Sequence, residues 1–342
     1  MLKDKKILFL SVQTFNYEKA IADKLRDFGA IVDYFDERPS NSIFAKGIIR
    51  FKRDLYQKKI DAYYRNLLQK TNTTTYDFLF VIKGEVVPRF FLEEFRKSNP
   101  HCKFIFYTWD SFANNPNAVS ILSYFDEKFT FDGKDAVEHK INFRPLFFID
   151  QYQKINKEQK KNAFKYHLLF LGTAHSDRCK ISNSIVEWCS QNKYSSFAYY
   201  FMPSKIVFIY KSLFDNTFQN CSYRKISFKS LTIDNIVDLY ESSSVILDIN
   251  HPGQHGLTMR TFEALGAGKK IITTNPDVKK YPFYNDNNVF VINRENVVLD
   301  TSFFESPFEK IPDQLYQEMS LSGWLKAIFI EKNQNCWMEV LK

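Results

Sequence analysis

The stretch SVILDINHPGQHGLTMRTFEALGAGKKIITTN, residues 244–275, indicates the fold most directly. It begins with an apolar run that is typical of a strand buried on both faces. A polar loop with two glycines follows, and an amphipathic segment then predicts a helix that begins near Leu257–Thr258. After Gly266 and Gly268 the chain is expected to enter a second buried strand, Lys270–Thr274. Strand, loop, helix and strand in this order predict a parallel βαβ unit.

The loop and the start of this predicted helix are the part of the stretch that carries chemistry. A glycine-containing loop that opens a helix presents backbone N–H groups at the positive end of the helix dipole. This arrangement makes an anion site, and Arg260 in the first turn can add a charge-assisted bond to a phosphate. Glu263 lies about one turn deeper, where its carboxylate can accept bonds from a ribose diol. The alternative is a buried crossover whose glycines serve packing only.

This stretch resembles the donor-binding signature of the GT-B glycosyltransferases, in which a loop, a helix and an FEALGAGK-like turn bind a sugar nucleotide. It is similar in particular to bacterial glycosyltransferases of surface-polysaccharide clusters and to CgeB-like spore-maturation proteins. The resemblance implies that Glu263 binds the ribose and that the diphosphate receives backbone N–H groups from Gly256, Leu257 and Thr258. Many retaining members carry a second Glu eight positions earlier, where this chain has His255. That departure leaves retention or inversion of configuration open, together with the group that contacts the sugar.

A second piece of the predicted donor site is LLFLGTAHSDR, residues 168–178. It predicts a buried strand ending in Gly172 and Thr173, then a short polar loop with Arg178 at a helix start. In GT-B enzymes the matching loop approaches the donor phosphates, and CgeB-like proteins carry a similar strand–Gly–Ser–Arg arrangement. The resemblance therefore implies that Arg178 is a phosphate ligand, against the alternative of a solvated surface arginine.

The pattern of the remaining sequence predicts an α/β protein with two doubly wound Rossmann-like domains facing across a cleft, as in GT-B enzymes. Buried strands alternate with amphipathic helices in the first half, and the pattern restarts at residues 167–171. The polar segment Gln151–Lys165 between them is the expected linker. We expect an acceptor-side domain over residues 1–155 and a nucleotide-sugar-binding domain over residues 156–342, whose last helix can pack back on the first domain. The apolar run Ile206–Tyr210 is of uncertain type.

Two carboxylates in the first domain are candidates for acid–base chemistry. Lys83-Gly84-Glu85 follows one predicted strand and Thr108-Trp109-Asp110-Ser111 follows another. Both segments lie at carboxyl ends of strands and are expected to face the cleft. Transfer with inversion needs a general base, and Asp110 and Glu85 are the carboxylates available for this role. For Asp110 the alternative is a turn or a helix N-cap.

No metal site is expected. The sequence has no DxD motif between strand ends, and Asp132-Gly133-Lys134-Asp135 does not fit that pattern. A helix dipole and arginines would then stabilise the leaving diphosphate. The nucleoside-diphosphate sugar is expected as a co-substrate, with no further cofactor required.

The 342 residues carry a formal net charge of +8, which favours anionic partners. The segment Ile48–Lys70 is basic and aromatic, and as an amphipathic helix it predicts peripheral contact with an anionic membrane. The alternative is a surface helix packed on the sheet by Leu55, Ile60, Leu67 and Leu68. No nucleic-acid partner is expected, because no DNA- or RNA-binding motif accompanies the charge.

Five cysteines without CxxC spacing argue against a disulfide framework and against a zinc site. The short apolar stretch near the N-terminus predicts a buried strand rather than a signal peptide, and no run approaches the length of a membrane span. We therefore expect a cytoplasmic protein in a reducing compartment, at the inner face of the membrane where the basic helix binds lipid.

These observations predict an enzyme that moves a sugar from a nucleoside-diphosphate sugar to a glycan or lipid-linked glycan acceptor in bacterial envelope polysaccharide synthesis. Two alternatives remain open. A sugar-nucleotide epimerase of the same architecture would bind the same donor and transfer nothing. A non-catalytic nucleotide-sugar or glycan-binding module would keep the fold without activity, and His255 in place of a carboxylate is compatible with it.

Overall fold

The computed structural model describes residues 1–158, 164–218, 221–331 and 335–341. Contacts divide the chain into two compact units, which we call unit 1 (Met1–Pro145 with Leu321–Lys342) and unit 2 (Leu146–Ser320). The division falls after residue 145 and again after residue 320. The sequence predicted one boundary near residue 155.

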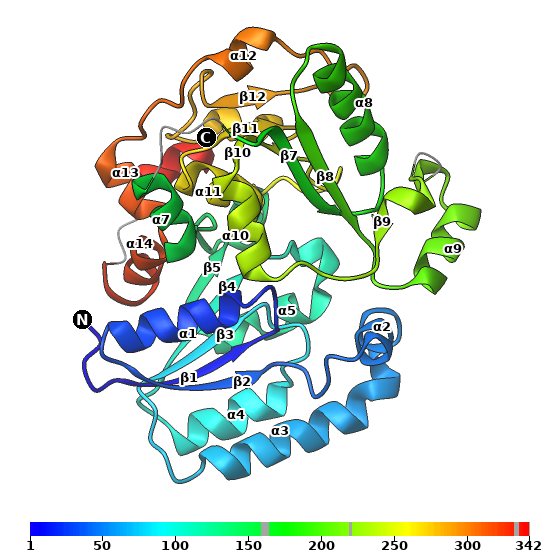
Figure 1. The fold of residues 1–342 in the computed structure, drawn as a ribbon. Helices are drawn as coiled ribbons and strands as arrows, with labels where there is room; N and C mark the ends of the chain where they lie inside the picture. The colour runs from blue at the N-terminus through cyan, green and yellow to red at the C-terminus, as the bar shows by residue number, and fades with distance from the viewer. Residues whose placement is uncertain (159–163, 219–220, 332–334, 342) are drawn as a thin grey trace. The chain divides into compact units, whose positions relative to one another are not determined.

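Unit 1 is built on one parallel sheet of six strands (Figure 1). Along the sheet the strands are β2 (Ile31–Asp36), β1 (Lys6–Ser11), β3 (Phe78–Ile82), β4 (Lys103–Thr108), β5 (Glu127–Thr130) and β6 (Asn142–Phe143). The connecting helices are α1 (Tyr17–Asp27), α2 (Ile43–Phe51), α3 (Gln57–Thr71), α4 (Arg89–Ser98), α5 (Pro116–Ile121) and α6 (Gly133–His139). The chain returns to this unit with α14 (Leu321–Lys326).

The central strands of unit 1 are buried on both faces, which is why their sequences are continuous apolar runs. Leu79 and Val81 of β3 belong to the cluster that also contains the buried residues of α3 and α4. Phe80 points to the opposite face, where its ring lies 6.1 Å from the ring of Trp324 in α14. Helices therefore cover both faces of this sheet.

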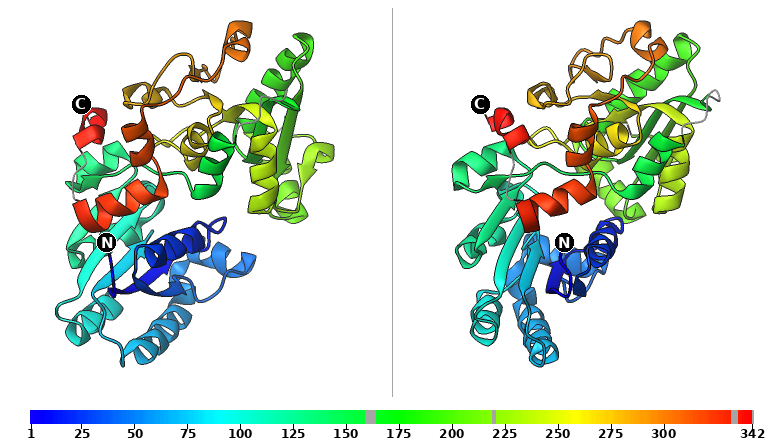
Figure 2. Two further views of the ribbon diagram at one scale, coloured as in Figure 1. Left: turned by 60° about the vertical axis from the view of Figure 1, so that its left-hand side comes forward. Right: turned by 90° about the vertical axis from the view of Figure 1, so that its left-hand side faces the viewer.

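Unit 2 contains a second parallel sheet of six strands. Its order is β12 (Val289–Val291), β11 (Lys270–Thr273), β10 (Ser243–Asp248), β7 (Tyr166–Thr173), β8 (Ser196–Phe201) and β9 (Ile226–Ser227). Its helices are α7 (Asp150–Lys157), α8 (Arg178–Gln191), α9 (Lys205–Phe214), α10 (Ile233–Glu241), α11 (Met259–Gly266), α12 (Thr301–Glu305) and α13 (Asp313–Glu318) (Figure 2). The prediction of two α/β halves with parallel sheets is confirmed.

The segment predicted as a linker, Gln151–Lys165, lies largely in a helix where it is described. Residues 151–157 belong to α7, and residues 159–163 lie outside the described residues. Tyr152 and Ile155 are buried although their neighbours are polar, and the Tyr152 ring lies 5.0 Å from the ring of Tyr240 in α10. Two apolar residues three positions apart are enough to place a polar helix against unit 2.

The sequence argued against a disulfide framework, yet the structure contains a disulfide between Cys179 and Cys221. They are 42 residues apart in the sequence, yet their Cα atoms lie 5.3 Å apart. Cys179 is in the first turn of α8, and Cys221 follows α9 in the connection to β9. The spacing of cysteines along a chain does not reveal such proximity, since the fold brings the two segments together.

The basic segment Ile48–Lys70 is engaged in packing through its aromatic side chains. Tyr64 is fully buried, and its hydroxyl donates to the backbone oxygen of Glu37 over 2.9 Å. Ile60 and Leu67 of α3 are buried beside it, whereas Leu55 is exposed. The packing alternative therefore accounts for most of this helix. Within the described part of the chain, no helix combines the length and the apolar character that crossing a bilayer requires.

Gly266 at the end of α11 allows a close approach that any larger residue would block. A Cβ atom built there would lie 2.3 Å from Cγ of Phe148, which is buried. We expect Gly266→Ala to lower the free energy of unfolding of unit 2 by about 1–3 kcal/mol, measured by urea denaturation. The control is Gly47→Ala in α2, where nothing lies within 4 Å of the added atom. Equal stability of Gly266→Ala and wild type would contradict the packing described here.

The disulfide yields a second prediction. Closing a loop of this length restricts the unfolded chain, so a reductant should lower the unfolding free energy by about 2–4 kcal/mol. The double variant Cys179→Ser, Cys221→Ser should be as unstable as reduced wild type and should not respond to the reductant. A wild-type denaturation curve that is unchanged by the reductant would show that the bond is not formed in solution.

Candidate functional site

The carboxyl edge of the unit 2 sheet gathers the residues of the predicted donor site. The strands of this sheet pair in parallel, so the loops that follow β7, β10, β11 and β12 emerge at the same edge. Each of these loops carries polar or charged side chains. Ligands of open parallel sheets bind at this edge.

Asp248, the last residue of β10, fixes the start of α11. Its buried carboxylate accepts hydrogen bonds from the hydroxyls of Thr258, over 2.8 Å, and Thr261, over 3.2 Å. Thr258 is the N-cap residue of α11, and its side chain makes no cap bond to the helix. The contacts with Asp248 therefore hold the N-terminus of α11 at the end of β10.

The three loop residues before Thr258 are held by different contacts. The backbone oxygen of His255 accepts from Nδ2 of Asn275 over 3.0 Å, and its exposed ring lies 3.6 Å from the Asp277 carboxylate. The backbone oxygen of Gly256 accepts from Nε2 of Gln254 over 2.9 Å. Leu257 is buried and anchors the loop. The loop is thus fixed through its carbonyl oxygens and one apolar side chain.

Arg178 lies at the carboxyl edge and is not a solvated surface residue. Its Nε donates to the backbone oxygen of Ile249 over 2.7 Å, which links the start of α8 to the end of β10. Burial lowers the pKa of its guanidinium to about 10, and the carboxylate of Asp248 opposes that shift. A cation in this position is desolvated and already close to the β10–α11 loop. His175 in the same loop is also desolvated, and burial lowers its pKa to about 3.

Gly172 and Thr173 are the last residues of β7 rather than loop residues, as predicted for a strand that ends there. They pair with Tyr200 and Phe201 of β8. A Cβ atom on Gly172 would lie 2.7 Å from the ring of Phe170. The described contacts of this glycine are therefore those of strand packing.

Glu263 and Arg260 meet at one buried phenol. The Glu263 carboxylate is buried and accepts a hydrogen bond from the Tyr240 hydroxyl over 2.9 Å. Nη1 of Arg260 donates to the same hydroxyl oxygen over 3.3 Å. Burial acts to lower the pKa of Arg260, but the nearby Tyr240, Glu263 and Asp248 outweigh it and raise the pKa. Burial, followed by the charge of Glu263, raises the pKa of Tyr240.

Arg294 is a member of this site that the sequence analysis did not single out. Its Nη2 donates to the backbone oxygen and to Oδ1 of Asn250, each over 2.6 Å. Its Nη1 donates to both carboxylate oxygens of Asp177, over 2.9 and 2.8 Å. Arg294 follows β12 at the carboxyl edge, so the rule that pointed to Arg178 also applied to it. Because β12 is a short strand, the position of Arg294 after it was a weak indication of a site residue.

The carboxyl edge of unit 1 holds a second cluster of charged residues. Glu85 accepts a hydrogen bond from Nε of Arg38, and its other oxygen lies 3.1 Å from Nζ of Lys83. The same Lys83 nitrogen lies 3.4 Å from the Asp110 carboxylate. Lys83 and Gly84 both have positive φ angles, 85° and 66°, which form the tight turn after β3. The structure thus brings the two predicted carboxylates together around one lysine.

The two carboxylates differ in their environment. Burial acts to raise the pKa of Glu85, but the hydrogen bond from Arg38 and the charge of Lys83 outweigh it, and the pKa is lowered. Asp110 is more exposed, and one of its oxygens accepts from Nδ2 of Asn114 over 3.4 Å. The helix cap in this loop is Ser111 rather than Asp110.

Glu37 is a second residue that the sequence did not reveal. It is fully buried after β2, and its carboxylate accepts backbone N–H groups from Gly84 and Val86 on either side of Glu85. Burial, followed by the charge of Glu85, raises the pKa of Glu37 to about 8. Glu37 therefore positions the turn that presents Glu85.

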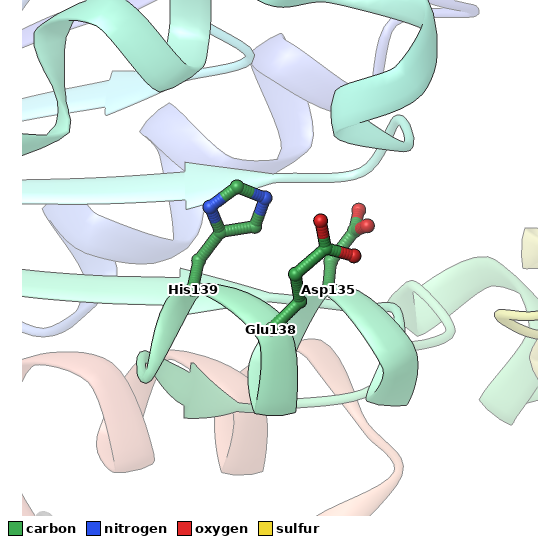
Figure 3. Close-up of side chains that lie close together, drawn as sticks. All are labelled: Asp135, Glu138 and His139. Atoms are coloured by element: carbon green, nitrogen blue, oxygen red, sulfur yellow. The ribbon is translucent and has the colours of Figure 1, made fainter.

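One group of possible metal ligands occurs among the described residues, on α6. Asp135, Glu138 and His139 offer ligand atoms within 4.8 Å of one another (Figure 3). Asp135 already accepts the backbone N–H of Phe112 over 2.9 Å, and the His139 ring lies 4.7 Å from the Phe112 ring. Burial raises the pKa of Asp135, which opposes the ionised form that binds a cation. These contacts explain the group as packing around Phe112.

Solved structures of three enzymes resemble the whole chain. An α-glucosyltransferase in complex with UDP and a 13-mer DNA aligns with 98% of this chain and 100% of its own, with a TM-score of 0.56 and 12% identity. A trehalose-phosphate synthase (UDP-forming) from Burkholderia xenovorans, in complex with glucose-6-phosphate, covers 94% of this chain and 98% of its own, with a TM-score of 0.58 and 10% identity. A glycosyltransferase from Rickettsia africae covers 99% of both chains, with a TM-score of 0.52 and 14% identity.

At these identities the likeness establishes the fold. The chain has the GT-B fold, in which two parallel α/β sheets are joined in one polypeptide. No protein-family model matches the sequence, and a search of curated proteins gave no match.

The buried Glu37 predicts a pH dependence of stability. The pKa of Glu37 is about 8 in the folded chain and has an ordinary value of 4.5. The carboxyl group therefore contributes fully to the free energy of unfolding below pH 4.5, and this contribution is lost as the pH rises through 8. Wild type should therefore lose more unfolding free energy than Glu37→Gln between about pH 5 and pH 9, measured by urea denaturation. The exposed Glu94→Gln is the control and should follow wild type. Identical pH profiles for Glu37→Gln and wild type would refute the assignment.

Proposed function

We propose that the protein is a glycosyltransferase that binds a nucleoside-diphosphate sugar at the carboxyl edge of unit 2. The observation that carries this proposal is the group of cations around the start of α11. Arg178, Arg260 and Arg294 approach this region from three different loops or helices. Arg294 is paired with Asp177, and Glu263 and Asp248 lie near Arg260. Burial lowers the pKa of Arg178, so Arg178 is the cation that a further anion would stabilise most, and the helix N-terminus adds positive potential. A diphosphate is the ligand class that suits such a site.

The fold supports the same proposal. The α-glucosyltransferase with this fold was solved with UDP bound, and the trehalose-phosphate synthase is UDP-forming. We propose that unit 2 forms the donor domain, with backbone N–H groups of Gly256, Leu257 and Thr258 directed to the diphosphate. A ribose diol at Glu263 would join or replace the Tyr240 hydroxyl as hydrogen-bond donor to this carboxylate.

For the acid–base step we propose Asp110 ahead of Glu85. A carboxylate that is paired with Arg38 and Lys83 and has a lowered pKa is a weak base. Asp110 shares Lys83 but is less buried, which leaves it open to an acceptor hydroxyl. Glu85 then orients Lys83, and unit 1 forms the acceptor side.

The wider role is a proposal from the resemblance and the charge. We propose a bacterial enzyme of envelope polysaccharide synthesis, related to surface-polysaccharide or CgeB-like proteins. Its acceptor is a glycan or a lipid-linked glycan, and its net charge of +8 favours peripheral contact with an anionic membrane. The leaving diphosphate is stabilised by arginines and the α11 N-terminus, so transfer needs no metal.

Calorimetric titration with UDP, GDP, ADP and CMP tests the donor site. We expect one nucleotide to bind to wild type, and Arg178→Lys and Glu263→Gln to weaken it by about tenfold or more, because each removes a directed contact. Arg224→Ala, an exposed arginine of the same unit, is the control and should bind as wild type does. Thermal unfolding of each variant separates lost contacts from lost folding.

Three outcomes would count against parts of this proposal. If no nucleotide binds to wild type at millimolar concentration, the donor site is absent. If a nucleotide binds but no sugar moves to any acceptor, the protein is better explained as a non-catalytic binding module. If the donor sugar is altered without an acceptor, the protein is better explained as an epimerase than as a transferase.

A further inference from the structure

Helix α9 presents an apolar face to solvent. Its residues Lys205–Phe214 connect β8 to β9, and it lies beyond β9 at the edge of the unit 2 sheet (Figure 1). A crossover helix of a parallel sheet normally buries its apolar stripe against the sheet. In α9 the most exposed apolar residues are Ile206 (79%), Ile209 (57%), Tyr210 (64%), Leu213 (71%) and Phe214 (72%).

These residues form one continuous stripe. Their positions follow a spacing of i, i+3, i+4, i+7 and i+8, which places them on one side of the helix. The rings of Tyr210 and Phe214 lie 5.0 Å apart along it. The opposite side of α9 holds the buried Phe208, whose ring lies 5.3 Å from Phe218 and 5.2 Å from Tyr223. Phe208 therefore anchors the helix and leaves the stripe outside.

The segment of the chain that contains α9 is rich in basic residues. Between residues 205 and 229 the sequence has five basic residues and one acidic residue, Asp215. The basic residues are Lys205, Lys211, Arg224, Lys225 and Lys229. The ring of Tyr223 lies 5.2 Å from that of Phe208, so Tyr223 and the neighbouring Arg224 lie toward the anchored side of α9.

We propose that the exposed stripe of α9, which we call the α9 surface, docks on a membrane that contains anionic lipid. Apolar and aromatic side chains on one face with flanking Lys and Arg are the composition of helices that lie in a lipid interface. The apolar stripe enters the acyl boundary, and the cations contact the anionic headgroups. This inference rests on the membrane contact proposed above and names the surface that makes it. It does not depend on whether the protein binds a nucleotide.

A lipid surface suits these residues better than a second copy of the chain or another protein. A symmetric dimer through this face would bring the basic segment 205–229 of one copy toward the same segment of the other. Lysine is also depleted in protein–protein interfaces, whereas it is favoured beside anionic lipid.

The disulfide described above holds this surface in place. Cys221 lies in the connection that carries the surface, between α9 and Tyr223, and it is bonded to Cys179 at the start of α8. Without the disulfide, α9 would be held to unit 2 mainly by Phe208 and by the chain segments before and after the helix. The covalent link lets α9 keep its apolar stripe outside without a broad packed face.

The test is flotation of the full-length protein with vesicles of phosphatidylcholine alone or mixed equally with phosphatidylglycerol. Wild type should float with the mixed vesicles at low salt and be released at high salt. The double variant Ile209→Ser, Leu213→Ser should lose about tenfold or more in partitioning, because both residues lie on the stripe. The double variant Lys205→Gln, Arg224→Gln should lose the preference for phosphatidylglycerol.

The matched control is Val137→Ser, Val298→Ser, which removes two equally exposed apolar residues outside the α9 surface and should float as wild type does. Nucleotide titration of the Ile209→Ser, Leu213→Ser variant should match wild type, which separates this proposal from the donor site. Flotation of that variant equal to wild type would overturn the proposal. A wild-type dimer that the same variant dissociates, with no flotation of either, would assign the surface to a second copy instead.

Discussion

Parallel pairing of the strands is the constraint on which the described site depends. Among the described strands the named pairs in both sheets are parallel, so the residues that follow them gather at one edge of each sheet. In unit 2 this brings Arg178 to the oxygen of Ile249, and Arg294 to Asn250, across long stretches of sequence. In unit 1 it brings Lys83 to Asp110. The residues of each cluster come from distant segments, so neither cluster can form until the sheet brings those segments together.

Buried charge then determines what the edge of unit 2 can bind. Asp248 and Glu263 are buried, and their carboxylates accept hydrogen bonds from hydroxyl groups of threonine and tyrosine. Arg178 donates to a backbone oxygen, and burial lowers its pKa. Desolvated cations near a helix N-terminus gain most from an anion, because the low dielectric strengthens the attraction. The same surroundings make an empty site costly and a phosphate-bearing ligand favourable.

The sequence predicted the sheets well because strands buried on both faces are continuous apolar runs. It also indicated the β10–α11 loop, since glycines are scarce in this chain and two of them stand there. It did not single out Arg294, although Arg294 follows a strand as Arg178 does. It could not indicate Glu37 or the Cys179–Cys221 bond, which depend on contacts between distant segments. For the basic segment Ile48–Lys70 the sequence left membrane contact and packing on the sheet open, because periodicity does not tell which apolar face is covered, and the buried Tyr64 supports packing. The sequence likewise showed Ile206–Tyr210 only as an apolar run and could not predict that its apolar side chains are exposed.

Hydrogen–deuterium exchange with and without a nucleoside diphosphate tests the central claim most directly, that the carboxyl edge of unit 2 holds the donor. The account predicts slower exchange of backbone amides in residues 172–178 and 250–260 when the nucleotide that binds in titration is added. Exchange in α9 should stay unchanged, because no phosphate contact is assigned to it. Unchanged exchange at both segments in the presence of a bound nucleotide, with protection elsewhere, would contradict the account.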